Sequence, residues 1–314
     1  MKWDAVIINW NQAAATIRCV NSLLAFRRAP STVWVVDNAS NDSRRDLIPQ
    51  SCPVVSYIYN ERNLGFAGGN NAALRRIISS ESEAVLLLNN DAVISEPHLV
   101  QLLAALDENP RLGVVGPLLE ARQGSRRTIS AGGRDIARFP QTRIVYPPGG
   151  RAASHGASVC VETPDGRPMD ANSLRVAAYV PGTAVVIRTS LLRSVGLLEE
   201  AYFFSGEMAD FCRRAQSAGW TCAISPQALA LHAPAGGRLR DTLYRYYNLR
   251  NRFLFIRRHE PARRRLFGFW LGCGAAMAAR AILCGRPAAA RAVLLALRDG
   301  LAGRFGNRND LFGA

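Results

Sequence analysis

Short apolar segments that alternate with helical segments are the feature that most constrains the fold of this chain. Four apolar or β-branched runs predict buried strands: residues 5–8, 33–36, 54–59 and 84–88. Three stretches between and after them predict helices: residues 14–26, 70–79 and 97–109. A further strand is expected from residue 113. This alternation predicts an α/β fold built from βαβ units, with a mostly parallel sheet flanked by helices.

Polar side chains stand where three of these predicted strands end. Asn11 and Asp37 follow the first two strands, and Asn90 and Asp91 follow the fourth. Ligands of open parallel sheets bind at the carboxyl ends of the strands, so these side chains are expected to share one crevice. A carboxylate such as Asp91 can hold Mg²⁺ or Mn²⁺, and that ion would bridge a diphosphate. Taken alone, Asp91 is equally compatible with a residue that caps the next turn.

A segment rich in glycine and asparagine leads into the second predicted helix. Asn63, Gly68, Gly69 and Asn71 belong to it. Glycines at the start of a helix permit close backbone contact with a ligand, and the helix N-terminus favours anions. A single Gly-Gly pair is a weak signal, so this segment supports the predicted site only together with the strand ends.

Seven segments in a fixed order resemble a known family. They cover most of residues 4–237: VIINWN, VWVVDNASND, NLGFAGGNNAAL, LLLNNDAVI, VPGTAVVIRTSLLRSVGLLEEAYFF, GEMADFCRRAQSAGW and ALALHAPAGG. With these segments in this order, the chain resembles the family 2 glycosyltransferases of the GT-A type, in particular the bacterial rhamnosyltransferase-like branch. The resemblance implies transfer, with inversion, of a sugar from a dTDP- or UDP-sugar to a glycan or lipid-linked acceptor. Rhamnose is the sugar that this branch suggests.

The same resemblance assigns roles to individual residues. Asp37 is expected to contact the base of the nucleotide, and Asn11 and Asn63 to line the nucleotide pocket. Asn90 and Asp91 occupy the family's metal-binding position, with Asp91 as the ligand of Mg²⁺ or Mn²⁺. His232 matches a position that approaches the metal or the diphosphate, although a packed or surface histidine would fit the sequence equally well.

The sequence departs from the family at the residue expected to act as the base. The family reads Glu-Asp-x-Asp at the start of the acceptor-side helix, whereas residues 207–210 read EMAD. Met208 cannot accept a proton, and an inverting displacement needs a general base. We expect Glu207 to be that base and Asp210 to orient the acceptor or the helix start, unless Asp210 pairs with Arg213 or Arg214. The alternative is a catalytically weakened homologue that still binds nucleotide-sugar.

The net charge of +15 is concentrated in the C-terminal part of the chain. Residues 238–314 hold 16 of the arginines and only four acidic residues. We therefore predict a catalytic domain over residues 1–240 and a basic, amphipathic helical tail over residues 241–314 that associates with an anionic membrane surface. The predicted location is cytoplasmic, on the inner face of the plasma membrane.

The apolar stretch of the tail is too short to span a bilayer without a charge. Residues 266–279 lie between Arg265 and Arg280, whereas a span needs about 20 apolar residues. A helix in the bilayer interface fits this pattern, and so does a helix packed on the body of the protein. Before it, the motif YRYYNLRNRFLFIRRH offers five arginines to a lipid-linked diphosphate: Arg245, Arg250, Arg252, Arg257 and Arg258.

Other partners and compartments find little support. Seven cysteines without a CxxC pair disfavour a zinc ribbon or a thioredoxin-type site and fit a reducing compartment. Only the charge suggests nucleic acid, and no nucleic-acid-binding motif accompanies it, so we expect no nucleic-acid partner.

Residues 121–172 are rich in Gly, Arg and Pro and are predicted to form an irregular hairpin or a mobile loop over the site. The sequence carries no sign of an oligomeric state.

Overall fold

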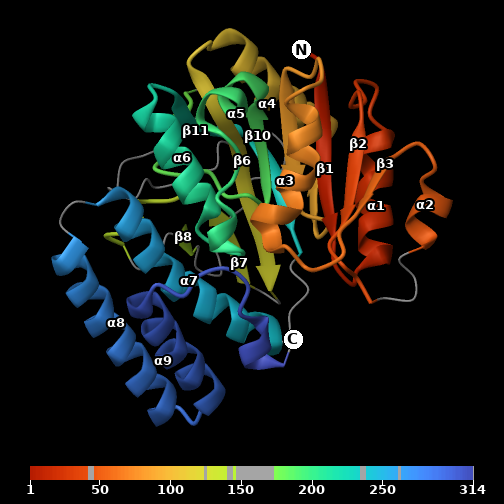
Figure 1. Cartoon of the computed structure of the whole chain (residues 1–314). Coiled ribbons are helices and arrows are strands. Elements are labelled where there is room, and N and C mark those ends of the chain that lie inside the picture. The colour runs from red at the N-terminus through yellow and green to blue at the C-terminus, as the bar shows by residue number, and fades with distance from the viewer. Residues whose placement is uncertain are drawn as a thin grey trace.

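A mixed sheet with helices on both faces forms the body of the protein. The computed structural model describes residues 1–41, 46–123, 126–139, 144–145, 173–233, 238–260 and 263–313. Within these residues the sheet has 11 strands, and its main path runs β3-β2-β1-β4-β10-β6-β11-β5 (Figure 1). The remaining strands lie off this path, with β7 on β6, β8 on β7, and β9 on β11.

The N-terminal half of the sheet is parallel, as predicted. Its strands are β1 (Trp3–Asn9), β2 (Val33–Asp37), β3 (Ser56–Tyr59) and β4 (Ala84–Leu88). β1 pairs in parallel with both β2 and β4, and β2 pairs in parallel with β3. The third strand begins two residues later than predicted, because Val54 lies in a turn and is 73% exposed. All four strands consequently end at the same edge of the sheet.

The other half of the sheet is mixed, because one strand runs against its neighbours. β10 (Ala184–Arg188) is antiparallel to β4 and to β6 (Leu112–Gln123). β11 (Thr221–His232) is parallel to β6 and antiparallel to the short β5 (Ala92–Ile94), which the sequence did not predict. The antiparallel β10 brings the segment before it to the edge where β4 ends.

Two strands lie between Arg175 and Arg188. β9 (Arg175–Val176) pairs with β11, and β10 begins only after Pro181 and Gly182. Of the loop predicted over residues 121–172, β6 continues to Gln123, and β7 (Arg126–Ser130) and β8 (Ile144–Val145) form a hairpin extension. Most of that predicted loop lies outside the described residues.

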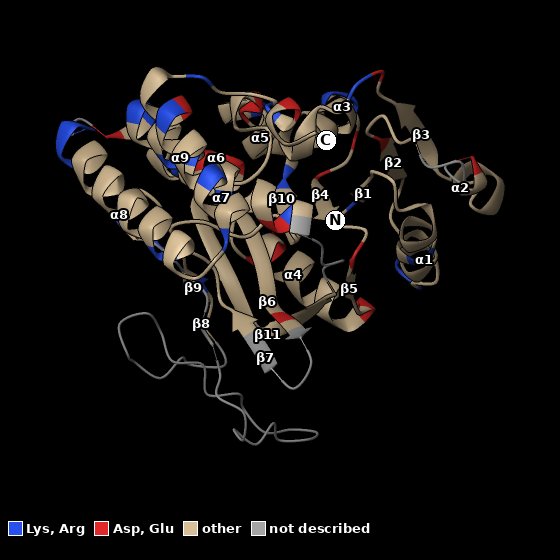
Figure 2. Ribbon diagram, turned by 90° about the horizontal axis from the view of Figure 1, so that it is seen from below, with Lys and Arg blue, Asp and Glu red and all other residues tan. Residues whose placement is uncertain are grey.

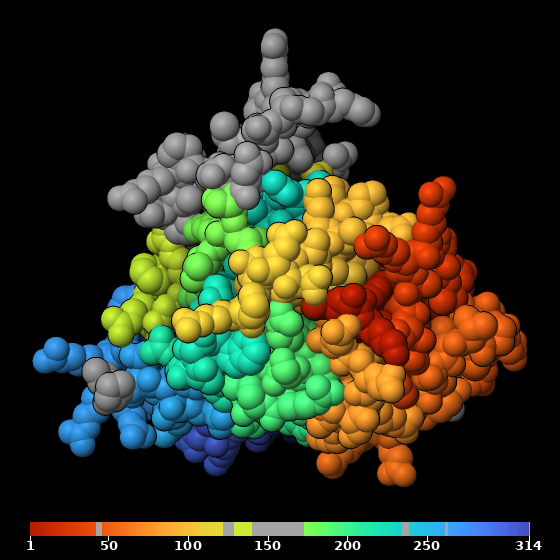
Figure 3. Space-filling view, turned by 90° about the horizontal axis from the view of Figure 1, so that it is seen from above, coloured from red at the N-terminus to blue at the C-terminus, as the bar shows by residue number. Residues whose placement is uncertain are grey.

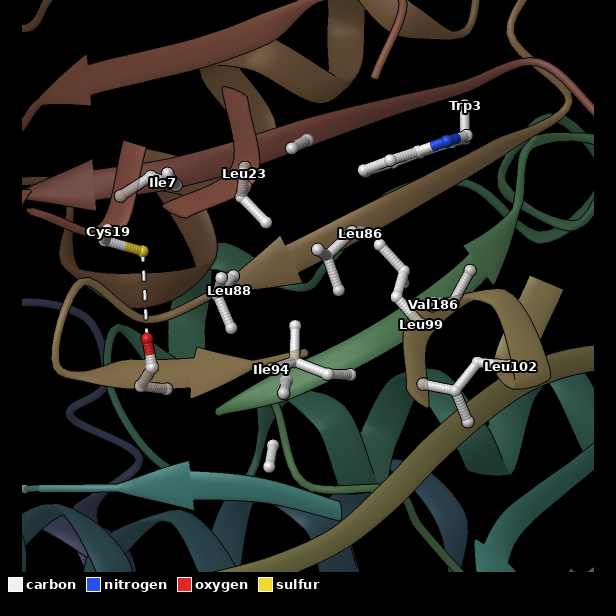
Figure 4. Packing of buried hydrophobic residues seen from close by; sticks show 14 of the residues in the cluster. Trp3, Ile7, Cys19, Leu23, Leu86, Leu88, Ile94, Leu99, Leu102 and Val186 are labelled. Carbon is white, nitrogen blue, oxygen red and sulfur yellow. Dashed lines mark hydrogen bonds between the residues drawn. The ribbon is translucent and has the colours of Figure 1, made fainter. Parts of the chain in front are cut away.

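Helices cover both faces of the sheet because successive strand residues point to opposite sides. Ala5 and Ile7 belong to a core with α1 (Ala13–Leu24), α2 (Leu47–Ser51) and α4 (Glu96–Glu108). Val6 belongs to a second core with α3 (Gly65–Ile77), α5 (Thr189–Val195) and α6 (Glu207–Ser217), which lie in front of the sheet in Figure 1. Figure 4 shows the first core, with Ile7, Leu23 and Leu86 packed between β1, α1 and β4.

The helix predicted over residues 70–79, which is α3, begins earlier than predicted because a carbonyl group caps its first turn. α3 starts at Gly65, and the backbone N–H of Phe66 donates to the carbonyl of Phe203 at 2.7 Å. Gly65 has a φ of +69°, and a side chain there would collide with the same carbonyl. The glycine therefore allows α3 to start directly against the segment that precedes α6.

The C-terminal helices form a separate layer beside the sheet. α7 (Arg238–His259), α8 (Arg263–Leu283) and α9 (Pro287–Ala302) enclose a third core, which Tyr202 and Phe203 join from the short helix η1 (Glu200–Tyr202). Seen from above, these blue helices lie on the side of the molecule opposite the red and orange N-terminal strands (Figure 3). The apolar stretch 266–279 lies in α8, and the motif YRYYNLRNRFLFIRRH lies in α7. The last element is the short helix η2 (Asn309–Phe312).

Candidate functional site

The carboxyl ends of β1, β2 and β4 bring together the polar residues that follow them. This edge is at the bottom of Figure 1, and Figure 2 shows it from below, with acidic and basic segments side by side near β4 and β10. The convergence predicted from the sequence follows from the parallel register of β1 with its two neighbours.

A buried hydrogen-bond network connects the three strand ends. Asn9, the last residue of β1, donates to Asp37 Oδ2 at 2.8 Å and accepts from Thr16 Oγ1 at 2.8 Å. Thr16 Oγ1 in turn accepts from Asn90 Nδ2 at 3.0 Å. Asn9 is fully buried and Asp37 is 1% exposed. The network fixes Asp37 and Asn90 relative to each other through a residue that the sequence analysis did not single out.

Asn11 adopts an unusual backbone conformation that ties the first loop to the second. Its φ is +55°, a left-handed value that asparagine tolerates better than most residues. Its backbone N–H donates to Ser40 Oγ at 2.9 Å, and its side-chain Oδ1 accepts from the backbone N–H of Asn41 at 2.8 Å. Asp37 Oδ1 accepts from the backbone N–H of Ser40 at 2.9 Å, so both predicted residues shape the same pair of loops.

Asn63 lies in a turn organised by a second asparagine. Asn38 Nδ2 donates to Asn63 Oδ1 at 2.9 Å and to the carbonyl of Gly65 at 3.0 Å, and Asn38 is 2% exposed. Asn63 Oδ1 also accepts from the backbone N–H of Gly65 at 2.8 Å. Gly68 faces Leu64 and Glu200, and a side chain there would collide with Leu64. The structure accounts for the glycine at position 68 by packing within α3.

Asp91 lies in the turn between β4 and β5, beside the last residue of β11. Because β5 and β11 are antiparallel, with Ala92 opposite His232, His232 Nε2 comes within 3.3 Å of Asp91 Oδ1. Arg240, in the first turn of α7, donates to Asp91 Oδ2 from both terminal nitrogens at 3.1 and 3.2 Å. The carboxylate therefore contacts a histidine and an arginine and does not cap its turn. Burial raises the pKa of Asp91, but the His232 and Arg240 contacts outweigh it and lower that pKa.

Two atoms of this cluster are buried without a hydrogen-bond partner. Asp91 Oδ1 and His232 Nε2 are close, but their geometry is not that of a hydrogen bond. A carboxylate oxygen and an imidazole nitrogen are both ligands of Mn²⁺ and related divalent ions. Among the described residues no group of three His, Cys, Asp or Glu side chains converges, so the protein would offer such an ion two ligands. Two ligands fit an ion that also binds water and diphosphate oxygens.

Glu207 opens α6 and is a carboxylate without a cation beside it. It is 6% exposed, and its Oε2 has no hydrogen-bond partner. Burial raises the pKa of Glu207 to about 7, although its own backbone N–H and that of Ser205 act in the opposite direction. A carboxylate with a pKa near neutrality can take up a proton at the operating pH, which is the property of a general base.

Met208, at the position where the family carries its base, lies in the apolar core. It is 3% exposed and packs beside Phe66 and Gly182. Gly182 belongs to the segment before β10, and the backbone N–H of Asn89 donates to the neighbouring Thr183 carbonyl at 2.9 Å. These contacts connect the first turn of α6 to the turn that carries Asp91.

Asp210 is fully buried and is surrounded by cationic groups. It accepts hydrogen bonds from Arg214 Nε at 2.8 Å and from Arg258 Nε at 2.9 Å, and His259 Nε2 lies 2.8 Å from it. Burial alone would raise its pKa, but His259, Arg214 and Arg258 outweigh it and lower the pKa to about 2. Pairing with Arg214, one of the alternatives that the sequence left open, is therefore what the structure contains. Asp210 connects α6 to the end of α7.

Four of the five arginines predicted to attract a lipid-linked diphosphate form hydrogen bonds or ion pairs with other groups of the protein. Arg250 is fully buried and donates to the carbonyls of Gly306 and Tyr202, and Arg252 donates to the carbonyls of Ile136 and Phe139. Arg257 donates to the carbonyl of Leu301, and Arg258 pairs with Asp210 and Glu199. That prediction was wrong for Arg250 and Arg252, which are buried because the aromatic residues beside them pack inward, and it stays a prediction for the other three arginines. Arg245 and Arg258 are both exposed, and Arg245 is the one of the five that has no partner among the described residues.

The sequence analysis missed several residues of the site. Asn9 and Asn38 end or follow strands and could have been found by the same reasoning that found Asn11 and Asp37. Arg240 and His259 lie on α7, most of which the sequence assigned to the tail over residues 241–314, and no local pattern distinguishes them from the other basic residues there.

The chain is similar in sequence to known glycosyltransferases. The sequence profile of Glycosyl transferase family 2 matches residues 4–162. The low-salt glycan biosynthesis hexosyltransferase Agl10 of Haloferax volcanii is 25% identical over 223 residues, with 70% of this chain and 65% of that protein covered. The N-acetylglucosaminyl-diphospho-decaprenol L-rhamnosyltransferase of Mycobacterium tuberculosis is 24% identical over 246 residues, with 75% of this chain and 77% of that protein covered.

A solved structure shows the same arrangement of sheet and helices. GalNAc-T7, crystallised with UDP, GalNAc and Mn²⁺, matches with a TM-score of 0.61 and 14% identity over 84% of this chain. The chain spans 65% of the length of the Haloferax relative and 49% of the GalNAc-T7 chain.

Proposed function

The chain belongs to glycosyl transferase family 2 and has the GT-A fold, and we propose that it transfers a sugar, with inversion, from a nucleoside-diphosphate sugar to a hydroxyl group of a glycan or lipid-linked acceptor. The observation that carries this proposal is the placement of orphan polar atoms. Among the described residues, the buried side-chain atoms without a hydrogen-bond partner include those of Asp91 and His232, at the carboxyl edge of the sheet, and of Glu207, at the start of α6. Buried polar atoms are normally satisfied, so such a group points to a bound ion or substrate.

Asp91 and His232 would hold a divalent ion, Mg²⁺ or Mn²⁺, in this proposal. When bound, the ion supplies positive charge that stabilises the diphosphate as it leaves. Arg240 keeps Asp91 ionised and in place through its two hydrogen bonds, and its guanidinium adds charge beside the same group.

Asp37, Asn11 and Asn63 would form the nucleotide side of the site, with Asp37 toward the base. Their role is supported by the network that holds the loops after β1 and β2 together. Because Asn9 and Thr16 link Asp37 to Asn90, the nucleotide side and the metal side are parts of one rigid framework. Such preorganisation lowers the entropic cost of holding the donor in a reactive geometry.

Glu207 would act as the general base that deprotonates the acceptor hydroxyl. Its pKa of about 7 and its buried, unpartnered Oε2 support this assignment, and Met208 beside it has no group that could serve. Asp210 would position α6: its ion pairs to Arg214 and Arg258 fix the helix that carries Glu207 against α7. A base held in this way leaves one oxygen free for the acceptor.

The substrates are inferred from the relatives. The mycobacterial relative is, by its name, a rhamnosyltransferase that acts on N-acetylglucosaminyl-diphospho-decaprenol. By this analogy we propose dTDP-rhamnose or a UDP-sugar as the donor and a lipid-linked acceptor. An acceptor of this kind resides in a membrane, which agrees with a basic helical layer at residues 241–314 and a location at the cytoplasmic face of the plasma membrane.

α8 is the element through which such a membrane contact would occur. By length and composition it could cross a bilayer, and only 17% of its apolar window is buried. Trp270 nevertheless ties it to the body, because its indole N–H donates to the carbonyl of Ala137 at 2.7 Å. We therefore propose that α8 lies in the bilayer interface and does not span the bilayer.

Calorimetry with UDP and dTDP, each with and without Mn²⁺ or Mg²⁺, tests the proposal directly. We expect metal-dependent binding of at least one nucleotide, and we expect Asp91→Asn to reduce it about tenfold or more, as loss of a charged ligand does. Asp107→Asn is the matched control, since Asp107 lies exposed on α4. Absence of nucleotide binding with either metal would refute the proposed donor site.

A further inference from the structure

A cavity lined by three arginines lies between the C-terminal helices. Arg245 comes from α7, Arg280 from α8, and Arg286 from the turn before α9. The cavity has a volume of about 120 Å³, and Met277, Cys284 and Val293 line it between the arginines. A single water needs only about 15 Å³, so the cavity has room for a group of several heavy atoms.

The three guanidinium groups have no protein partner. Within the described part of the chain, the side chains of Arg245, Arg280 and Arg286 make no hydrogen bond, ion pair or ring contact. The other arginines of α7 differ, because Arg250 and Arg252 donate to backbone carbonyls and stack on aromatic rings. Three cationic side chains around one cavity, without a compensating group among the described residues, favour an anion beside them.

No acidic residue of the helical layer compensates this charge. Glu260 pairs with Arg138 and Arg213, Asp299 with Arg298, and Asp310 with Arg308. None of these carboxylates lines the cavity, and neither does Asp241. An anion that occupies the cavity must therefore come from outside the described chain.

The surroundings of the cavity indicate which anion this is. Ile282 and Leu283 follow Arg280 on α8 and are 62% and 86% exposed, and Phe269, Leu271 and Met277 on the same helix are also exposed. α8 is tan along most of its length in Figure 2, which reflects its few charges. Exposed apolar side chains next to unpaired arginines are complementary to the interface of a bilayer, where acyl chains and phosphates are a few ångströms apart.

We propose that this cavity binds the phosphate of an anionic phospholipid headgroup. Arg245, Arg280 and Arg286 donate to the phosphate oxygens, and the exposed apolar residues of α8 enter the acyl boundary beside it. The inference rests on the proposed membrane association of the helical layer and is independent of the assignments at Asp91 and Glu207. It gives the protein a defined orientation on the membrane, with the end of α8 at the headgroups.

Vesicle binding tests the site. Co-sedimentation is measured with vesicles of phosphatidylcholine alone and with vesicles that also contain phosphatidylglycerol. We expect binding only to the second kind, weakened by salt, and reduced about fivefold for each arginine replaced in Arg245→Gln, Arg280→Gln and Arg286→Gln. Arg111→Gln is the matched control, because Arg111 is exposed at the start of β6 and should leave binding unchanged.

Cys284 provides a second measurement, since it is exposed and lines the cavity. Its alkylation, followed by peptide mass spectrometry, should slow in the presence of phosphatidylglycerol vesicles and not in the presence of inorganic phosphate alone. Equal protection by inorganic phosphate would overturn the lipid assignment. Unchanged vesicle binding by the triple glutamine variant would overturn the site while membrane association stands, whereas failure of the unmodified protein to bind either vesicle would overturn both.

Discussion

Two regions of α6 contain buried carboxylates in opposite electrostatic surroundings. At the first residue of α6, Glu207 has no cation beside it among the described residues, and its pKa is raised to about 7. Three residues further, where α6 meets α7, Asp210 contacts two arginines and a histidine, and its pKa is lowered to about 2. Burial acts in the same direction on both carboxylates, so the partners decide the difference. The comparison teaches that a carboxylate surrounded by cations holds elements together, and one left without them is available for proton transfer.

Removing the proton acceptor from the first region is the change with the largest expected effect. Glu207→Gln should lower kcat by about 10²- to 10⁴-fold, the range that general-base catalysis contributes. Nucleotide binding, measured by calorimetry, should persist because Asp91 and Asp37 are untouched. Stability should not fall: because the pKa of Glu207 is raised from 4.5 to about 7, the cost of ionising it builds up between these two pH values and is complete above about pH 7, so the amide should raise the free energy of unfolding there. Wild-type turnover in this variant would assign the base elsewhere.

Loss of the carboxylate of Asp210, in the second region, should mainly lower the stability of the fold. Asp210→Asn leaves Arg214, Arg258 and His259 without their shared anion, and we expect the free energy of unfolding to fall by about 3 kcal/mol, the usual cost of removing one partner of a buried ion pair. Denaturant titration at neutral pH measures it, with Asp107→Asn on α4 as the exposed control.

The pH dependence of that effect follows from the lowered pKa. The contribution of Asp210 is complete above the pKa of an unfolded aspartate and is lost as the pH falls toward about 2, where the folded carboxylate takes up its proton. A destabilisation equal to that of the control would show that the carboxylate does not anchor α6.

Placing a carboxylate at position 208 tests whether the family's usual base position is still usable. Met208 is buried beside Phe66, so Met208→Asp should cost about 2 kcal/mol of stability and bring no gain in turnover. Met208→Leu is the matched control and should cost less than about 1.5 kcal/mol. A rise in kcat for the aspartate variant would favour the alternative of a catalytically weakened homologue.

The smallest effect is expected from pH alone. If Glu207 must be ionised, kcat/KM should fall about tenfold for each pH unit below about 7, because the protonated carboxyl cannot accept the acceptor's proton. The acid limb is measured on the unmodified enzyme and again on Asp210→Asn, which should shift the limb slightly to lower pH, because the charge of Asp210 raises the pKa of Glu207. If the midpoint of the acid limb lies near 4.5, the ordinary pKa of glutamate, the contrast between Glu207 and Asp210 is refuted.

Much of the N-terminal half could be predicted because its signals are local. The apolar run 84–88 is β4 to the residue, and the polar residues after β1, β2 and β4 converge because parallel strands end at one edge. The strand β5 was missed because three residues carry no periodicity, yet β5 is what places His232 beside Asp91. The antiparallel insertion of β10 was likewise invisible, since strand direction depends on pairing partners and not on the composition of the strand.

The C-terminal helices show why composition can mislead. Counting arginines predicted a charged surface, but Arg250 and Arg252 are buried and have backbone carbonyls and aromatic rings as partners. A guanidinium group can be satisfied by carbonyl oxygens and ring faces, which the sequence does not identify. Burial lowers the pKa of Arg252 to about 10. The hydrogen bonds that Arg252 donates to the carbonyls of residues 136 and 139 offset the cost of burying its charge. Only a three-dimensional arrangement separates these arginines from Arg245.

The ion pairs between α6 and α7 also bear on where the polypeptide can be cut. A truncation near residue 240, the boundary that charge alone suggests, would remove Arg258, His259 and Asn251, leave Asp210 with Arg214 as the one remaining cationic partner, and uncover the ring of Tyr202. We expect such a fragment to aggregate or to be degraded when it is produced by itself. The catalytic fold and its basic helices are thus better treated as a single cooperative folding unit in any effort to express, crystallise or redesign this enzyme.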